Sequence, residues 1–136
     1  MIKVFTAGTW DLFLVGHLNI LKQSKALGNY LIVGVSTEEL VFAYKHKIPV
    51  ISLEDRIEIV KSCRYVDEVI VQEELLGLDM LKEINPDIFT IGSDWKDKEV
   101  EGINYLISNN KKVIYFDYTK DISSTLLKKK IGFQSL

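Results

Sequence analysis

The sequence has little cysteine, little proline and no excess of basic residues, and each shortage excludes a class of protein. The one cysteine, Cys63, cannot form an internal disulfide bond or a multi-cysteine zinc site, which is typical of a reducing compartment. The formal net charge of −2 leaves no basic excess for binding nucleic acid or an anionic membrane. We therefore expect a cytoplasmic protein that binds neither.

Long apolar runs are also missing. No stretch approaches the roughly 18 apolar residues of a membrane span, and the segment "MIKVFTAGTW" lacks the apolar region and cleavage site of a signal peptide. With 2 prolines, 47% hydrophobic and 26% charged residues, the composition is that of an ordinary globular protein. A chain of 136 residues buries roughly two thirds of its unfolded surface, so we expect a single domain over residues 1–136.

Strand-like and helix-like segments alternate along the chain. Apolar, β-rich runs lie at residues 2–8, 29–37, 66–72, 87–92 and 112–118. Segments with helical spacing lie at 18–28, 51–63, 78–84, 99–107 and 123–131, with Gly28 placed to stop the first and Ser52 to cap the second. This alternation predicts an α/β fold in which a five-stranded parallel sheet carries helices on both faces.

One region breaks the alternation. Residues 36–50, "STEELVFAYKHKIPV", contain clustered basic residues and Pro49. Because such features interrupt regular structure, we expect a mobile loop after the second strand.

Ligands of an open parallel sheet bind beyond the carboxyl ends of the strands, so the polar residues that follow each apolar run are the site candidates. They are Thr6, Gly8, Thr9, Asp11, Ser36, Thr37, Gly92, Ser93, Asp94, Trp95, Thr119, Ser123, Ser124 and Thr125.

The loop after the first strand has the character of a phosphate site. Gly8 and Thr9 can bring backbone N–H groups to a phosphate at the start of a helix, and His17, which follows Gly16, can donate to a phosphoryl oxygen. The alternatives are a plain turn and a structural histidine, because the loop fits neither the dinucleotide nor the P-loop pattern. Leu14 stands one helical turn before His17, where a second imidazole would make chemical sense.

Basic residues elsewhere have two interpretations each. Lys45 and Lys47 are point charges that can close over a phosphate tail, or they belong to a solvated loop. Arg56 and Arg64 are eight residues apart, so one can face the crevice while the other pairs with Asp67 or Glu68. The lysines of the last helix, 128–130, are expected on a solvated face.

The aromatic and hydroxyl residues near the later strands also have two interpretations each. Trp95 beside Asp94 suits a base and ribose, or it packs in the core. The run 123–125 supplies hydroxyls to the same crevice, or it caps the last helix.

Together these motifs resemble a known family, the small HxGH nucleotidyltransferases, and within them the cytidylyltransferases. The resemblance rests on "GTWDLFLVGHLNIL", "VGVSTEE", "KHKIPVISLEDRIEIVKSCRYVDEVI", "IGSDW" and "ISSTLLKKKI", which span nearly the whole chain in order. It implies a Rossmann-like nucleotidyltransferase fold, a homodimer, and CTP with Mg²⁺ or another divalent cation. The implied reaction transfers CMP to a phosphorylated alcohol such as glycerol 3-phosphate.

The resemblance also implies roles for single residues, with no protein metal ligand. The implied catalytic residues are His17, Lys45, Lys47 and Ser124; the nucleotide-binding residues are Thr6, Gly8, Thr9, Gly16, Asp94, Trp95, Ser123 and Thr125; the acceptor-binding residues are Asp11 and Arg64.

Three positions depart from the family pattern. Leu14 replaces the first histidine of HxGH, Tyr118 stands in place of an arginine, and Asp121 replaces a glycine, although Lys120 could restore a charge. Since losing one oxyanion donor typically costs about 10²–10³ in rate, we expect an impaired cytidylyltransferase. The alternatives are a nucleotide-binding protein without turnover and a transferase with another nucleotide or a phosphonate acceptor.

Overall fold

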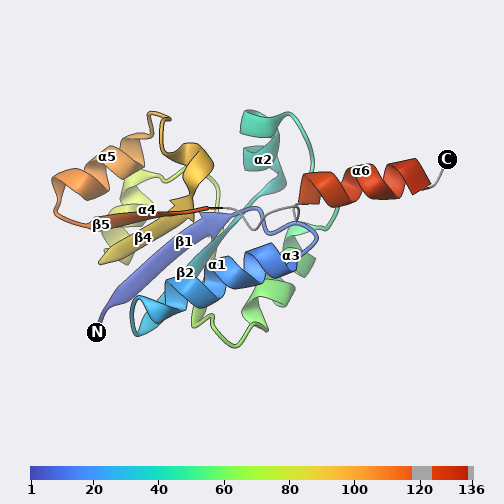
Figure 1. The fold of residues 1–136 in the computed structure, drawn as a ribbon. Helices are drawn as coiled ribbons and strands as arrows, with labels where there is room; N and C mark the ends of the chain where they lie inside the picture. Colours follow the sequence, from blue (N-terminus) through green and yellow to red (C-terminus); the bar gives the residue numbers. More distant parts are fainter. Residues whose placement is uncertain (118–123, 135–136) are drawn as a thin grey trace.

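The computed structural model describes residues 1–117 and 124–134, which form the α/β fold that the alternating pattern predicts (Figure 1). Within these ranges no helix has both the length and the apolar character needed to cross a bilayer. In chain order the elements are β1 (Lys3–Gly8), α1 (Val15–Ala26), β2 (Tyr30–Ser36), α2 (Glu38–Lys45), α3 (Leu53–Lys61), β3 (Glu68–Gln72), α4 (Leu78–Ile84), β4 (Ile88–Gly92), the 3₁₀ turn η1 (Ser93–Trp95), α5 (Glu101–Ser108), β5 (Lys112–Phe116) and α6 (Ser124–Gln134).

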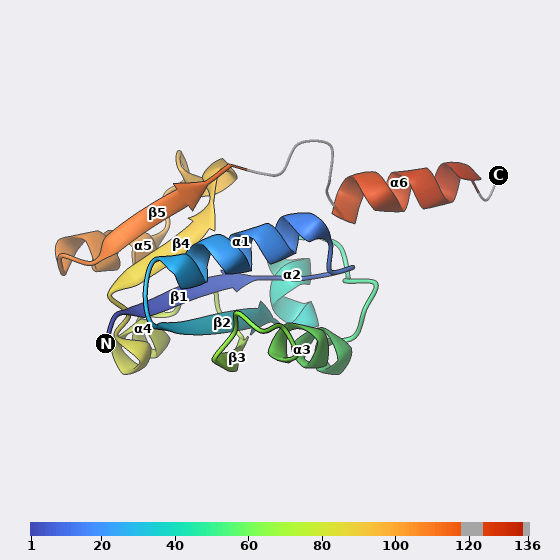
Figure 2. The same cartoon turned by 60° about the horizontal axis from the view of Figure 1, so that its bottom comes forward.

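The five strands are all parallel and lie in the order β3-β2-β1-β4-β5. The chain first winds outward from β1 to β3 and then crosses back to place β4 on the other side of β1. Because right-handed crossovers reverse face when the direction reverses, α1 and α3 cover one face while α4 and α5 cover the other (Figures 1 and 2). The order reverses between β1 and β4, which is where such sheets bind ligands.

Each face of the sheet has its own core, because successive side chains of a strand point to opposite sides. Val4 of β1 packs with Leu21 of α1 and Val60 of α3, and all three are fully buried. Its neighbour Phe5 packs on the opposite face with Phe89 and Leu106, which are also fully buried.

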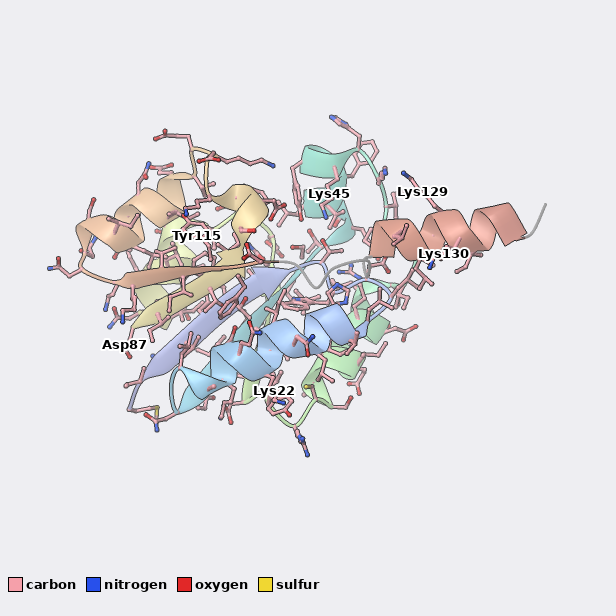
Figure 3. All side chains as sticks on the ribbon, viewed as in Figure 1. Lys22, Lys45, Asp87, Tyr115, Lys129 and Lys130 are labelled. Carbon is pink, nitrogen blue, oxygen red and sulfur yellow. The ribbon has the colours of Figure 1, made fainter. Side chains whose placement is uncertain are left out.

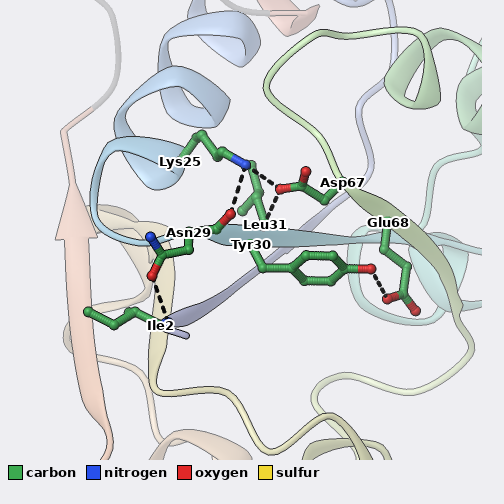
Figure 4. Close-up of polar contacts among 7 residues, drawn as sticks. All are labelled: Ile2, Lys25, Asn29, Tyr30, Leu31, Asp67 and Glu68. Atoms are coloured by element: carbon green, nitrogen blue, oxygen red, sulfur yellow. Dashed lines mark hydrogen bonds and ion pairs between the residues drawn. The ribbon is translucent and has the colours of Figure 1, made fainter.

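Polar contacts fasten the amino end of the sheet (Figure 4). The Asp67 carboxylate pairs with Lys25 and accepts the Leu31 N–H at 2.8 Å, so it joins α1, β2 and the start of β3. On the other side, the Ile2 N–H donates to the Asn29 side chain at 2.9 Å. These contacts fix the amino ends of the strands and leave their carboxyl ends for a site.

The structure differs from the expected segments at two places. Residues 36–50 are not an irregular loop, because α2 occupies Glu38–Lys45 behind an N-cap in which Thr37 accepts the Leu40 N–H at 3.1 Å. Its two leading glutamates also suit the positive end of the helix dipole, so the local signals for a helix outweigh the basic residues that follow. The first helix extends the apolar segment 18–28 back to Val15, so it includes Gly16 and His17, and Leu14 is its extended N-cap.

Gly28 follows the end of α1 as expected, but for a different reason. No glycine in the described residues has a positive φ, so Gly28 is not a left-handed helix stop. A Cβ at this position would lie 2.6 Å from the Ile2 carbonyl oxygen and 2.8 Å from Val4 Cγ2. The close approach of α1's end to β1 therefore requires glycine.

We expect Gly28→Ala to lower the free energy of unfolding by about 1–3 kcal/mol, because the new methyl overlaps backbone that cannot give way. Gly132→Ala is the matched control, since a Cβ there would meet no atom within 4 Å. It should stabilise α6 by up to about 1 kcal/mol. Urea denaturation of both variants measures the difference, and equal effects would contradict the packing argument.

Candidate functional site

A cleft of about 760 Å³ lies at the carboxyl ends of β1, β2 and β4, with α2 and the first turn of α1 as walls. Of the residues assigned to a site from the sequence, it brings together Thr6, Gly8, Thr9, Asp11, Gly16, His17, Lys45, Lys47, Asp94 and Trp95.

The β1–α1 loop at the base of this cleft is held in an uncommon conformation. Trp10 and Leu12 have φ values of 57° and 49°, in the left-handed region that non-glycine residues rarely adopt. The Trp10 indole is buried and donates to the Gly34 carbonyl at 2.9 Å. A Cβ at Gly8 would lie 3.2 Å from that ring, so Gly8 gives the indole room to fold back over the strand ends.

Asp11 lies between these two strained residues and is only 4% exposed. Its carboxylate accepts the Val50 and Ile51 N–H groups at 2.9 and 3.0 Å and pairs with Lys128 at 2.7 Å. Burial raises the pKa of Asp11, but Lys128 and the two N–H groups outweigh it, so the pKa lies below its ordinary value of 3.8. Asp11 is therefore ionised at neutral pH and joins three segments; its contact with an acceptor stays a prediction.

His17 presents a defined hydrogen-bond donor to the cleft. The Leu14 N–H donates to Nδ1 of His17 at 3.0 Å, so Nδ1 carries no proton and the neutral ring bears its hydrogen on Nε2. Burial lowers the pKa of His17 below 6.5; Lys45 lowers it further, while Asp11 acts in the opposite direction. At neutral pH the site thus holds an uncharged imidazole.

Leu14 also lines the cleft, with its side chain half-buried beside His17. A leucine side chain cannot donate a hydrogen bond, so this wall of the cleft is apolar where the family resemblance implies an imidazole. The backbone of Leu14 nevertheless orients the remaining histidine.

Arg56 supports the cleft from below and is fully buried. Its Nη1 donates to the carbonyls of Thr9 and Ser36, both at 2.8 Å, and its Nε donates to the Ile51 carbonyl at 2.9 Å. Nη2 is buried without a hydrogen-bond partner among the described residues. The guanidinium thus connects the loops after β1 and β2 with the segment before α3.

Arg64, which was assigned to the acceptor, is not in this cleft. It is exposed, and its Nη2 donates to the Tyr65 hydroxyl at 2.9 Å rather than pairing with Asp67 or Glu68. It borders a separate shallow groove with Phe13, Ile59 and Cys63. Because α3 ends at Lys61, Arg64 lies beyond the helix, so the eight-residue spacing does not place both arginines on one helical face, and Arg56 is the one that faces inward.

The upper wall of the cleft combines aromatic rings and lysines. Tyr44 and Trp95 meet edge to face at 6.1 Å between centroids, and the Tyr44 hydroxyl lies 3.3 Å from that of Thr9. Lys98 lies over the Trp95 ring at 4.8 Å from its centroid. Tyr44 and Lys98 were missed from the sequence, because the first lies in the expected loop and the second in an exposed turn.

Among the described residues that line the cleft, cations outnumber anions. Three lysines besides Lys128 line it, namely Lys45, which is labelled on α2 in Figure 3, Lys47 and Lys98. Against them stands the carboxylate of Asp94, because the charge of Asp11 is neutralised by Lys128. With the N-terminus of α1 beside His17, this arrangement suits a polyanion such as an oligophosphate.

The other residues predicted for the site either have partners within the fold or lie outside the described residues. Thr6 is buried and its hydroxyl donates to the Thr90 carbonyl at 3.0 Å. The backbone of α6 begins at Ser124 and includes Thr125, but Tyr118, Lys120, Asp121 and Ser123 lie outside the described residues. Across the parts that the structure describes, no three His, Cys, Asp or Glu side chains gather as a metal site requires.

A family model described as cytidylyltransferase-like matches residues 5–130. The chain belongs to this family. The cytidylyltransferase-like chain is 38% identical over 134 residues to the glycerol-3-phosphate cytidylyltransferase of Bacillus subtilis (strain 168), a match that covers 97% of this chain and 98% of the relative. The FAD synthase of Thermococcus sibiricus (strain DSM 12597 / MM 739) is 38% identical over 94 residues, or 68% of this chain and 64% of that protein.

The fold of this cytidylyltransferase-like chain also matches solved structures. A lipopolysaccharide core biosynthesis protein from Thermoplasma volcanium GSS1 superposes with a TM-score of 0.74 at 26% identity, over 88% of this chain and 99% of the other. The resemblance to the cytidylyltransferases and the Rossmann-like nucleotidyltransferase fold are thus confirmed. The roles of single residues stay predictions.

We expect His17 to titrate below pH 6.5 and to carry its neutral-form proton on Nε2. Long-range ¹H–¹⁵N NMR spectra report both properties, and His46→Asn removes the second of the 2 histidines for assignment. Lys45→Met should raise the pKa of His17, because a nearby cation that disfavours protonation is lost. An Nδ1–H tautomer would contradict the bond from Leu14.

We expect Arg56→Lys to lower the free energy of unfolding by about 2–4 kcal/mol, since an ammonium cannot span three carbonyls and leaves buried acceptors unpaired. The exposed Arg64→Lys is the matched control and should unfold like the parent protein. Urea midpoints compare the two, and similar midpoints would show that Arg56 does not hold the three segments together.

Proposed function

We propose that this protein transfers CMP from CTP to a phosphorylated alcohol, glycerol 3-phosphate or a similar compound, and releases pyrophosphate. The observation that carries the proposal is the end-to-end match to the glycerol-3-phosphate cytidylyltransferase, which covers nearly all of both chains. The cleft supports it independently, because its excess of lysines suits a triphosphate and its size suits a nucleotide.

In the proposed reaction an oxygen of the acceptor phosphate attacks the α-phosphorus of CTP, and the bond from that phosphorus to the β-phosphate oxygen breaks. The protein supplies positions and charge rather than a nucleophile. The Nε2–H of His17 donates to a phosphoryl oxygen, where negative charge grows in the transition state. Lys45 and Lys47 neutralise the departing pyrophosphate.

The nucleoside is proposed to lie against the upper wall. Trp95 offers a ring to the base and Asp94 an acceptor to the ribose hydroxyls, while Gly8, Thr9 and Gly16 place backbone near the phosphates. The family resemblance implies a phosphate-binding role for Ser123, Ser124 and Thr125 as well. Mg²⁺ or another divalent cation accompanies CTP as part of the substrate. A homodimer and a cytoplasmic location remain predictions.

A second candidate function is nucleotide binding without turnover. The observation that favours it is Leu14, whose apolar side chain lines the cleft beside His17. If the missing imidazole abolishes transition-state stabilisation while the lysines still hold the triphosphate, the protein binds CTP and releases no pyrophosphate.

We expect slow pyrophosphate release with CTP, Mg²⁺ and a phosphorylated alcohol, and a gain of about 10²–10³ in kcat for Leu14→His. Leu14→Phe is the matched control, because it fills the same space without a donor and should give no gain. His17→Ala should lose a similar factor. The panel contains all four nucleoside triphosphates with glycerol 3-phosphate, phosphoethanolamine and phosphocholine.

Three results would change the assignment. Absence of turnover in both the parent and Leu14→His, with CTP binding intact by calorimetry, supports the binding protein. Turnover of ATP but not CTP contradicts the cytidylyl assignment. Equal gains for Leu14→His and Leu14→Phe would show that bulk, and not the imidazole, limits the rate.

A further inference from the structure

Helix α6 extends away from the sheet, beyond the carboxyl edge of the strands, in both views of the fold (Figures 1 and 2). Among the described residues of α6, Lys128 is the one that lines the cleft. Its Nζ lies 2.7 Å from Oδ2 of Asp11, and its side chain is 38% exposed. Lys128 thus joins a peripheral helix to a nearly buried carboxylate.

That carboxylate is not an isolated partner. Asp11 also accepts the N–H groups of Val50 and Ile51, which belong to the same segment as the cleft residues Lys47, Ile48 and Pro49. The Asp11 side chain therefore links the β1–α1 loop, the segment before α3 and α6. A substitution of Lys128 can therefore alter the position of cleft residues, because the Asp11 carboxylate connects them.

The ion pair also has an electrostatic consequence for the cleft. Without Lys128, the Asp11 carboxylate would lose the cation that pairs with it directly, so less of its negative charge would be offset in a cleft whose other groups favour an anion. Such a charge repels an incoming oligophosphate over the distances found within a single cleft, because screening there is weaker than in bulk solvent.

We propose that Lys128 is a positioning residue, which anchors α6 to Asp11, fixes the Val50–Ile51 backbone and neutralises Asp11 toward an anionic ligand. The anchoring concerns the free protein alone. The effect on the nucleotide rests on the proposed function.

Hydrogen–deuterium exchange of the free, full-length chain tests the anchoring. We expect Lys128→Met to speed exchange about tenfold in α6 and at the Val50 and Ile51 amides, because local opening no longer breaks an ion pair. Lys128→Arg should restore protection, since the guanidinium can pair with the same carboxylate. The matched controls are Lys129→Met and Lys130→Met, on exposed positions of the same helix (Figure 3).

Binding of CTP with Mg²⁺, measured by calorimetry at low and high salt, tests the electrostatic part. Lys128→Met should weaken binding about fivefold at low salt and less at high salt. In the Asp11→Asn background the same change should have little effect, because the charge to be neutralised is gone. If turnover is measurable, KM for the triphosphate should rise more than kcat falls.

The outcomes separate this proposal from the proposed function. If exchange in α6 and at residues 50–51 responds equally to Lys128→Met and Lys129→Met, the anchoring is overturned whatever the activity. If CTP binding is lost equally from Lys128→Met in both Asp11 backgrounds, neutralisation is overturned. If no nucleotide binds the parent protein while exchange responds to Lys128→Met alone, the anchoring is supported and the proposed function fails.

Discussion

The cleft depends on one buried guanidinium. Arg56 has no exposed surface, and it donates to carbonyls that end β1, end β2 and precede α3. Burial lowers the pKa of this arginine, while Asp11, Glu38 and Tyr44 act in the opposite direction, and an arginine remains charged in either case. A fixed positive charge under three loops lets backbone carbonyls point inward where water cannot reach them.

The hydrogen bonds of Arg56 also help to hold the strained β1–α1 loop in place. Trp10 and Leu12 are held at positive φ while Asp11 between them is fixed by three donors. The loop then enters α1 at Leu14, whose N–H sets the tautomer of His17. The donor offered to a ligand is therefore defined by backbone geometry, and the identity of the Leu14 side chain changes what stands beside the imidazole without changing its orientation.

Much of the architecture could be predicted from the sequence, because apolar strand-length runs and helical spacing are local patterns. The position of the cleft followed from the parallel sheet, and His17, Lys45 and Lys47 line it as expected. The helix at Glu38–Lys45 was missed because its capping signals are short and basic residues follow them. The choice of Arg56 over Arg64 and the partnership of Asp11 depend on contacts between distant segments, which periodicity does not encode.

The ion pair between Asp11 and Lys128 also orders events while the chain is being made. Asp11 leaves the ribosome early, with the first strand and helix, whereas its counter-charge emerges only after β5. Until then this carboxylate, which is 4% exposed in the folded protein, lacks the cation that pairs with it directly. The sheet can therefore assemble on the nascent chain before α6 pairs with Asp11, so the side of the cleft that Lys128 forms is the last to be completed.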